Sequence, residues 1–196
     1  VPPGKAIAMD KLPERMHPAH LQNIDRYNTA IILFVTVCAS CRVTNTFANE
    51  IMHAIIREAW IEASAYRVGA YVVMPDHIHL FCSPATPEAE NVAKWVGYWK
   101  RLVTIKAKAR AFMGGASAPM PAADGEAAVP PVPEKRAVVP PLPLLLFQRD
   151  CWDRQLRSGE SYHEKWEYVR NNPLRKGLAT SPEEWPYAGV INDLMW

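Results

Sequence analysis

The strand arrangement of this chain follows from the segment YRVGAYVVMPDHIHLFCS, residues 66–83. Two apolar runs, Tyr66–Met74 and His77–Ser83, are separated only by Pro75 and Asp76. Proline fixes one backbone angle and aspartate supports a tight turn, so the two runs predict the strands of a hairpin. A parallel pair would need a crossover of a dozen residues or more, for which there is no room.

The remaining elements are predicted from the periodicity on either side of the hairpin. Residues 30–39 are apolar and β-branched, as in a core strand, and a helix capped by Asn45 or Thr46 is expected to run to about Ala63. The further elements expected are a helix over 91–111, a strand over 144–148 and a last helix from about residue 159 that carries Tyr168 and Asn172. This order predicts an α+β, ferredoxin-like fold. It is a βαββαβ antiparallel sheet with helices on one face, and an extra C-terminal helix carries the tyrosine.

The chain of 196 residues has the length of one domain with short appendages. In residues 114–143, 18 of the 30 residues are proline, alanine or glycine, and eight are proline, which removes amide donors from helices and strands. We interpret this segment as a flexible insertion in a single domain over residues 30–190. Residues 1–29 are expected to form an irregular arm, and residues 191–196 a tail.

The composition argues against membrane and disulfide-rich secreted proteins. There is no apolar run of membrane-spanning length and no signal-peptide pattern, so a cytoplasmic location is expected. Four cysteines are too few for a disulfide framework, and Cys38-x-x-Cys41 lacks the second ligand pair of a zinc site. We expect these cysteines to be reduced, and Cys38 to lie where a strand ends.

The charge is mild overall but uneven along the chain. Although the net charge is only +2, residues 91–112 contain six basic residues and no acidic residue. The expected helix over this segment therefore carries a local cationic surface. Trp95 and Trp99 lie between these cations at a spacing more typical of core residues than of a base-stacking surface.

Two histidines mark a candidate metal site on the second hairpin strand. Side chains alternate along a strand, so His77 and His79 point to the same side and can converge on one ion, whereas Ile78 and Leu80 face the other side. A His-x-His pair alone is a weak signal, because two such histidines are often structural.

A tyrosine and an asparagine form the second half of the candidate site. Tyr168 and Asn172 are four residues apart on the expected last helix, so they share one face. If that face lies against the histidine strand, Asn172 can offer its amide oxygen as a third ligand and Tyr168 lies beside the metal. A phenol with a pKa of about 10 is a poor nucleophile. A divalent metal that polarises the phosphate makes the phosphorus easier to attack, so a weaker nucleophile suffices.

Both halves of this site resemble a known family. The segment Val72-Val-Met-Pro-Asp-His-Ile-His-Leu80 resembles the His-hydrophobic-His (HUH) signature of the single-tyrosine, IS200-like transposases of single-stranded DNA. The segment Tyr168-Val-Arg-Asn-Asn-Pro-Leu-Arg-Lys-Gly-Leu178, followed by Glu184-Trp-Pro186, is similar to the REP-associated tyrosine transposases. The resemblance covers about residues 30–112 and 144–190. The chain departs from the pattern in the 114–143 insertion and in Asp76, where asparagine is common.

The resemblance implies a reaction and a role for each site residue. Members of the family cut and rejoin single-stranded DNA near hairpins, through a 5′-phosphotyrosine link and a free 3′-hydroxyl. It implies that His77 and His79 bind Mg²⁺ or Mn²⁺, that Tyr168 is the nucleophile, and that Asn172 is a third ligand. The expected partner is single-stranded or hairpin DNA, including REP-like palindromes, which would bring the protein to the bacterial nucleoid. We expect a monomer rather than a homodimer that exchanges the tyrosine helix.

Basic side chains are the candidates for contacts with DNA phosphates, which position a strand without reading its sequence. They are Lys100, Arg101, Lys106, Lys108, Arg110, Arg149, Arg154, Arg157, Arg175 and Lys176. Two other functions stay open from the sequence. One is a domesticated protein that binds hairpin DNA without turnover, and the other is a metal-dependent hydrolase in which the histidines activate water.

Overall fold

The computed structural model describes residues 31–40, 46–115, 146–156 and 159–194. In this part of the chain the strands are β1 (Leu33–Cys38), β2 (Tyr66–Val73), β3 (His77–Pro84), β4 (Trp152–Gln155) and β5 (Ala188–Val190). The helices are α1 (Glu50–Glu62), α2 (Val92–Gly115), α3 (Gly159–Arg170), α4 (Asn172–Arg175) and the short 3₁₀ helix η1 (Pro182–Glu184). None of these helices is long and apolar enough to cross a membrane.

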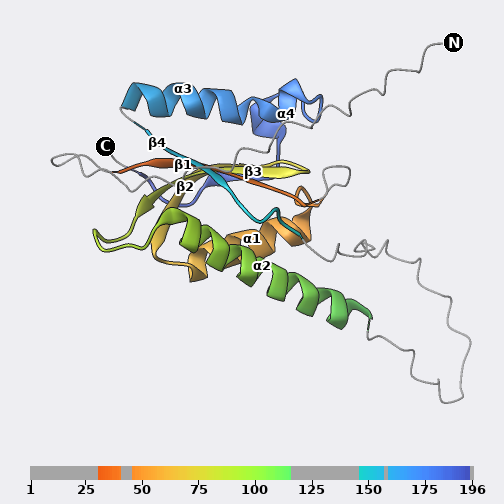
Figure 1. The fold of residues 1–196 in the computed structure, drawn as a ribbon. Helices are drawn as coiled ribbons and strands as arrows, with labels where there is room; N and C mark the ends of the chain where they lie inside the picture. The colour runs from red at the N-terminus through yellow and green to blue at the C-terminus, as the bar shows by residue number, and fades with distance from the viewer. Residues whose placement is uncertain (1–30, 41–45, 116–145, 157–158, 195–196) are drawn as a thin grey trace, which may run out of the picture.

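The strands form one antiparallel sheet in the order β4-β1-β3-β2-β5 (Figure 1). The first four positions give the ferredoxin-like βαββαβ plan, so the predicted fold class is confirmed. The predicted hairpin is also confirmed, because the Met74 amide donates to the His77 carbonyl at 2.8 Å and closes the turn at Pro75 and Asp76. The added strand β5 pairs with β2 and was not predicted, since three residues are too few for a periodic signal.

The two faces of the sheet bury different sets of side chains. On one face, Val35, Val37, Ile78 and Leu80 pack with the buried sides of α1 and α2. Trp95 and Trp99 lie in this core, as their spacing predicted. On the other face, a smaller cluster joins β1, β2 and β3 to Val169 of α3. In Figure 1, α1 and α2 lie below the sheet, and α3 and α4 lie above it. This separation assigns each strand residue to one layer or the other.

Several predicted boundaries were wrong. The first strand is shorter than residues 30–39, and α1 is capped by Asn49, whose side chain accepts from the Met52 amide, rather than by Asn45 or Thr46. The last helix stops at Arg170 and a separate short helix begins at Asn172, because Pro173 has no amide with which to continue the first helix.

The fourth strand lies at 152–155 rather than 144–148. Leu146 and Phe147 are buried core residues, and Phe147 makes a single β-bridge to Ala39. The sequence of the strand is Trp-Asp-Arg-Gln. Because three of its four residues are polar, it lacks the apolar alternation that would have predicted an edge strand. Residues 1–29, and the 114–143 segment apart from its two glycines at the end of α2, lie outside the described residues.

Candidate active site

The histidine pair lies on the sheet face that α3 covers. His77 and His79 alternate with buried Ile78 and Leu80, and their ring centroids are 4.7 Å apart. Asp76 Oδ1 lies 2.7 Å from Nδ1 of His77, and Thr36 Oγ1, directly across on β1, lies 2.9 Å from Nδ1 of His79. Because Nδ1 is held in both rings, Nε2 is the atom with which each ring can bind an ion. Such outer contacts orient histidine ligands in metal sites.

The surroundings keep His79 neutral. Burial, together with the nearby His77 and Lys165, lowers the pKa of His79 to about 3, while Asp76 acts in the opposite direction. A neutral imidazole presents a lone pair to a metal, whereas an imidazolium does not. At physiological pH His79 is therefore in the form that a cation requires.

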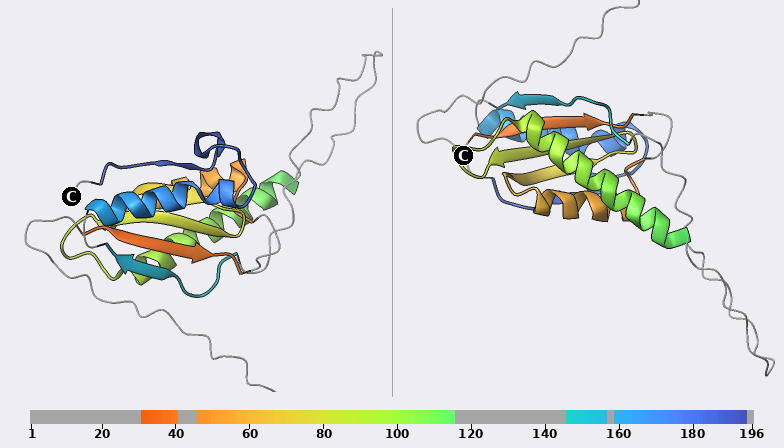
Figure 2. Two further views of the ribbon diagram at one scale, coloured as in Figure 1. Left: turned by 90° about the horizontal axis from the view of Figure 1, so that it is seen from above. Right: turned by 60° about the horizontal axis from the view of Figure 1, so that its bottom comes forward.

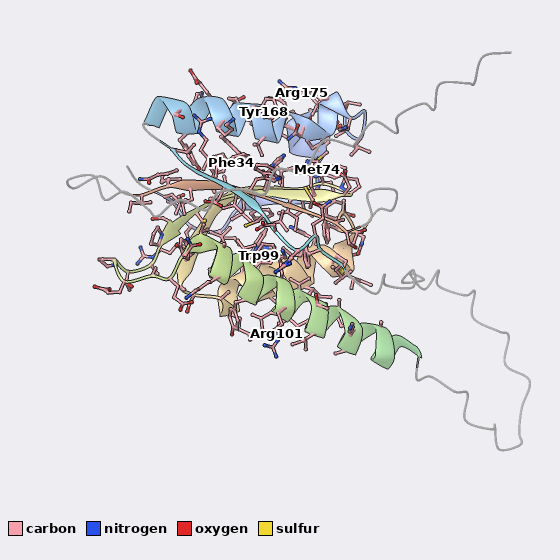
Figure 3. All side chains as sticks on the ribbon, in the orientation of Figure 1. Phe34, Met74, Trp99, Arg101, Tyr168 and Arg175 are labelled. Carbon is pink, nitrogen blue, oxygen red and sulfur yellow. The ribbon has the colours of Figure 1, made fainter. Side chains whose placement is uncertain are left out.

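A chain of ring and cation contacts connects the histidines to Tyr168 on α3. Phe34 of β1 stacks on His79, with centroids 5.3 Å apart. The Lys165 ammonium lies 5.4 Å from the Phe34 centroid and 5.7 Å from that of Tyr168. Figure 3 shows Tyr168 on the upper helix layer, with Phe34 and Met74 between that layer and the sheet. The two predicted halves of the site therefore lie on the same face of the molecule.

Tyr168 is accessible and has two cations near its ring. Its side chain is 50% exposed. Its neighbour Val169 is buried and holds α3 to the sheet, while the Arg175 guanidinium carbon lies 4.3 Å from the Tyr168 ring centroid. Arg175 was predicted as a phosphate contact, but Lys165 was missed. Its signal in the sequence was its position three residues before Tyr168, which places both on one helix face.

Asn172 is the third predicted ligand. Its Nδ2 atom is buried and has no hydrogen-bond partner. A buried amide nitrogen without an acceptor is unfavourable, and rotating the amide by half a turn puts the oxygen in that position. Oxygen is the ligand atom that Mg²⁺ prefers and Mn²⁺ accepts. Within the described residues no hydrogen bond joins Asn172 to the histidines, so its place in the ligand set stays a prediction.

The donor set suits a divalent cation that shares its coordination with a substrate. In the part of the chain that the structure describes, no group of three or more histidine, cysteine, aspartate and glutamate side chains is placed to hold a metal ion. Two imidazoles and one amide leave an ion's other positions to water or phosphate oxygens. This donor set fits Mn²⁺, which accepts imidazole nitrogen. It can also serve Mg²⁺, whose preference for oxygen would be met by the amide, water and phosphate oxygens.

The basic residues of α2 lie on the opposite layer from this site. The Lys100 ammonium is buried and donates to the carbonyls of Gln148 at 2.7 Å and Arg149 at 3.0 Å, so it holds the fold together instead of meeting phosphate. Lys106 and Arg110 pair with Glu58 of α1.

The other residues predicted to contact DNA phosphates lie in both helix layers, in the sheet and in the loops. Arg101 and Lys108 are exposed on α2, and Figure 3 shows Arg101 directed away from the sheet. Arg149, Lys176 and Arg154 are exposed, and Arg154 of β4 is paired with Phe34, on the face of the histidines. Arg157 lies outside the described residues.

The fold is similar to that of two solved structures. A REP-associated tyrosine transposase bound to a REP hairpin matches with a TM-score of 0.58 and 16% sequence identity, over 86% of this chain and 82% of that chain. A proposed transposase from Deinococcus radiodurans R1 matches with a TM-score of 0.43 and 14% identity, over 77% of this chain and 97% of that chain. No family model and no curated protein matches the sequence. The fold implied by the resemblance to the REP-associated tyrosine transposases is thereby confirmed.

Proposed function

We propose that this protein is a metal-dependent enzyme that cuts and rejoins single-stranded DNA near hairpins, with Tyr168 as its nucleophile. The observation that carries the proposal is the chain of contacts from His79 through Phe34 and Lys165 to Tyr168. It brings a paired-histidine centre and an accessible tyrosine to one face from segments about 90 residues apart in the sequence.

His77, His79 and Asn172 would hold the divalent cation, Mg²⁺ or Mn²⁺. When bound, the cation neutralises charge on the scissile phosphate and orients it. The protein's own contribution is to hold Nδ1 of both imidazoles, by Asp76 and Thr36, so that the ligand nitrogens are ready before the ion arrives.

In the proposed reaction, the Tyr168 hydroxyl loses its proton to water and its oxygen forms a bond to phosphorus. The bond from phosphorus to the 3′ oxygen breaks, and that oxygen takes up a proton. One phosphodiester is exchanged for another, so the 5′-phosphotyrosine retains the energy needed for rejoining and no nucleotide cofactor is required. The free 3′-hydroxyl of a strand later reverses the step.

Lys165 and Arg175 are placed to hold the phosphate that Tyr168 attacks. Both contact the Tyr168 ring, and Arg175 is exposed to solvent. A cation beside the nucleophile stabilises the charge that develops on the phosphate oxygens. We propose that a single copy of the chain carries out this reaction as a monomer.

Hairpin DNA is the substrate class that we propose for this site, and a transposase of similar fold has such a DNA bound. That transposase was solved with a REP hairpin bound. At 16% identity the likeness shows the fold alone, so the DNA partner of this chain rests on the site and on the test below.

The decisive experiment is to incubate the protein with labelled single-stranded DNA that contains a hairpin, in the presence of Mn²⁺. We expect an adduct that survives denaturation, because the link is covalent, and we expect Tyr168→Phe to abolish it. Tyr98→Phe is the matched control, since Tyr98 is also 50% exposed but lies on α2, in the other layer. An adduct that persists in Tyr168→Phe would rule out this nucleophile.

The same assay separates the two alternatives. DNA binding without an adduct would indicate a binding protein, and a free 5′-phosphate without an adduct would indicate a hydrolase. We expect His77→Ala to lose the adduct but keep DNA binding, because the metal site and the cations that contact phosphates are separate groups.

A further inference from the structure

We propose that Trp152, with Arg154 beside it, stacks a base of the bound strand next to the histidine pair. The inference rests on the proposed function, because it assigns a base-binding position on the same DNA. Neither residue touches the reacting groups.

The sheet register places Trp152 in line with the metal site. Trp152 of β4 is paired with Thr36 of β1, and Thr36 is paired with His79 of β3. Paired residues of adjacent strands project to the same face, so Trp152 lies on the face of the histidines. Two strand spacings separate it from His79, roughly 10 Å. A strand whose phosphate lies at the histidines can therefore place a nearby base on this side chain.

Trp152 is exposed although its strand is anchored in the core. Its side chain is 54% exposed, whereas Leu156, four residues on and on the same face, is 3% exposed. Seen from above, α3 lies beside β1 and β4 rather than over them (Figure 2, left). The end of β4 nearest the histidines thus offers a large aromatic surface to solvent, at a sheet edge, where proteins often place charged side chains.

Two cations lie near this aromatic surface, on the same face. Arg154 is exposed and paired with Phe34, over whose ring the Lys165 ammonium lies. An exposed aromatic ring interleaved with cations is the pattern by which proteins hold single-stranded nucleic acid, through stacked bases and contacted phosphates. It selects an unpaired strand over a duplex, whose bases are already stacked, and it tolerates any base.

The test uses the full chain without added metal, so that the DNA stays intact. A hairpin oligonucleotide with a single-stranded extension carries 2-aminopurine at successive positions, one per oligonucleotide. We expect the fluorescence of one position to be quenched on binding to the wild type and not to Trp152→Leu. Binding to Trp152→Leu should weaken by about tenfold, the usual effect of losing one stacked base.

Two variants keep the result interpretable. Trp152→Phe retains an aromatic ring and should restore most of the quenching. Tyr98→Leu removes a similarly exposed aromatic residue from the other layer and should leave binding and quenching unchanged.

Three outcomes are distinguishable. If Trp152→Leu binds and quenches like the wild type while the Tyr168 adduct forms, the stacking inference is wrong and the proposed function stands. If quenching depends on Trp152 but no adduct forms with Mn²⁺, stacking is supported and the chemistry is wrong. If the wild type does not bind the single-stranded extension, both proposals are refuted.

Discussion

Thr36→Val should weaken metal binding without disturbing the sheet. The Thr36 hydroxyl lies 2.9 Å from Nδ1 of His79, which leaves Nε2 as the ring nitrogen that would bind the proposed cation. Valine has nearly the same shape as threonine and is equally suited to a strand, so the substitution removes the hydroxyl and little else. The perturbation therefore isolates one hydrogen bond.

The expected magnitude follows from that contact. Losing one partly buried hydrogen bond costs about 1 kcal/mol of folding stability. Losing the contact that orients a ligating histidine lowers metal affinity by about 10- to 100-fold in characterised sites. We expect the Mn²⁺ concentration for half-maximal adduct formation to rise by about tenfold, equivalent to about 1.4 kcal/mol.

The assay is a Mn²⁺ titration followed both by adduct formation and by electron paramagnetic resonance of the free ion, so that binding is measured apart from turnover. Thr104→Val is the matched control. Thr104 also uses its hydroxyl in one hydrogen bond, to the Lys100 carbonyl at 2.8 Å, but it lies on α2. An unchanged Mn²⁺ requirement in Thr36→Val, or an equal shift in Thr104→Val, would refute the reasoning.

Two further predictions concern stability. Lys100→Met should lower the free energy of unfolding in urea by about 2–4 kcal/mol, because it leaves the carbonyls of residues 148–150 without their charged donor. An unchanged free energy of unfolding would contradict this. The second concerns pH. The pKa of His79 is about 3 in the folded chain and about 6.5 for an unperturbed histidine, so between these pH values the unfolded state binds more protons. Stability should fall as pH drops below about 6.5, by at most about 1.4 kcal/mol per unit from this group. His79→Phe should flatten that slope in denaturation measured across pH.

The hairpin and the layered fold could be predicted from the sequence because they depend on local chemistry. Pro75 and Asp76 leave room only for a turn, and apolar alternation assigns Ile78 and Leu80 to the core whatever the rest of the chain does. The same alternation placed His77 and His79 together. These features require only neighbours in the sequence, so short-range rules suffice to find them.

The fourth strand could not be found this way. Trp152–Gln155 is a strand because it pairs with β1, and nothing in its own composition favours a strand over a loop. The apolar run before it misled the prediction, because burial of Leu146 and Phe147 requires no extended pairing. Propensity is a weak guide wherever tertiary contacts determine the backbone.

By itself, the sequence determined that two histidines share one side of a strand and that Tyr168 lies on a helix with Asn172 following closely. Only the tertiary structure put that helix over that strand, and only it separated the cations by layer. It turned Lys100 inward and brought Lys165 against Phe34 and Tyr168. The physical reason is that side-chain periodicity fixes which residues share a face of one element, whereas the packing of one element on another depends on the whole core.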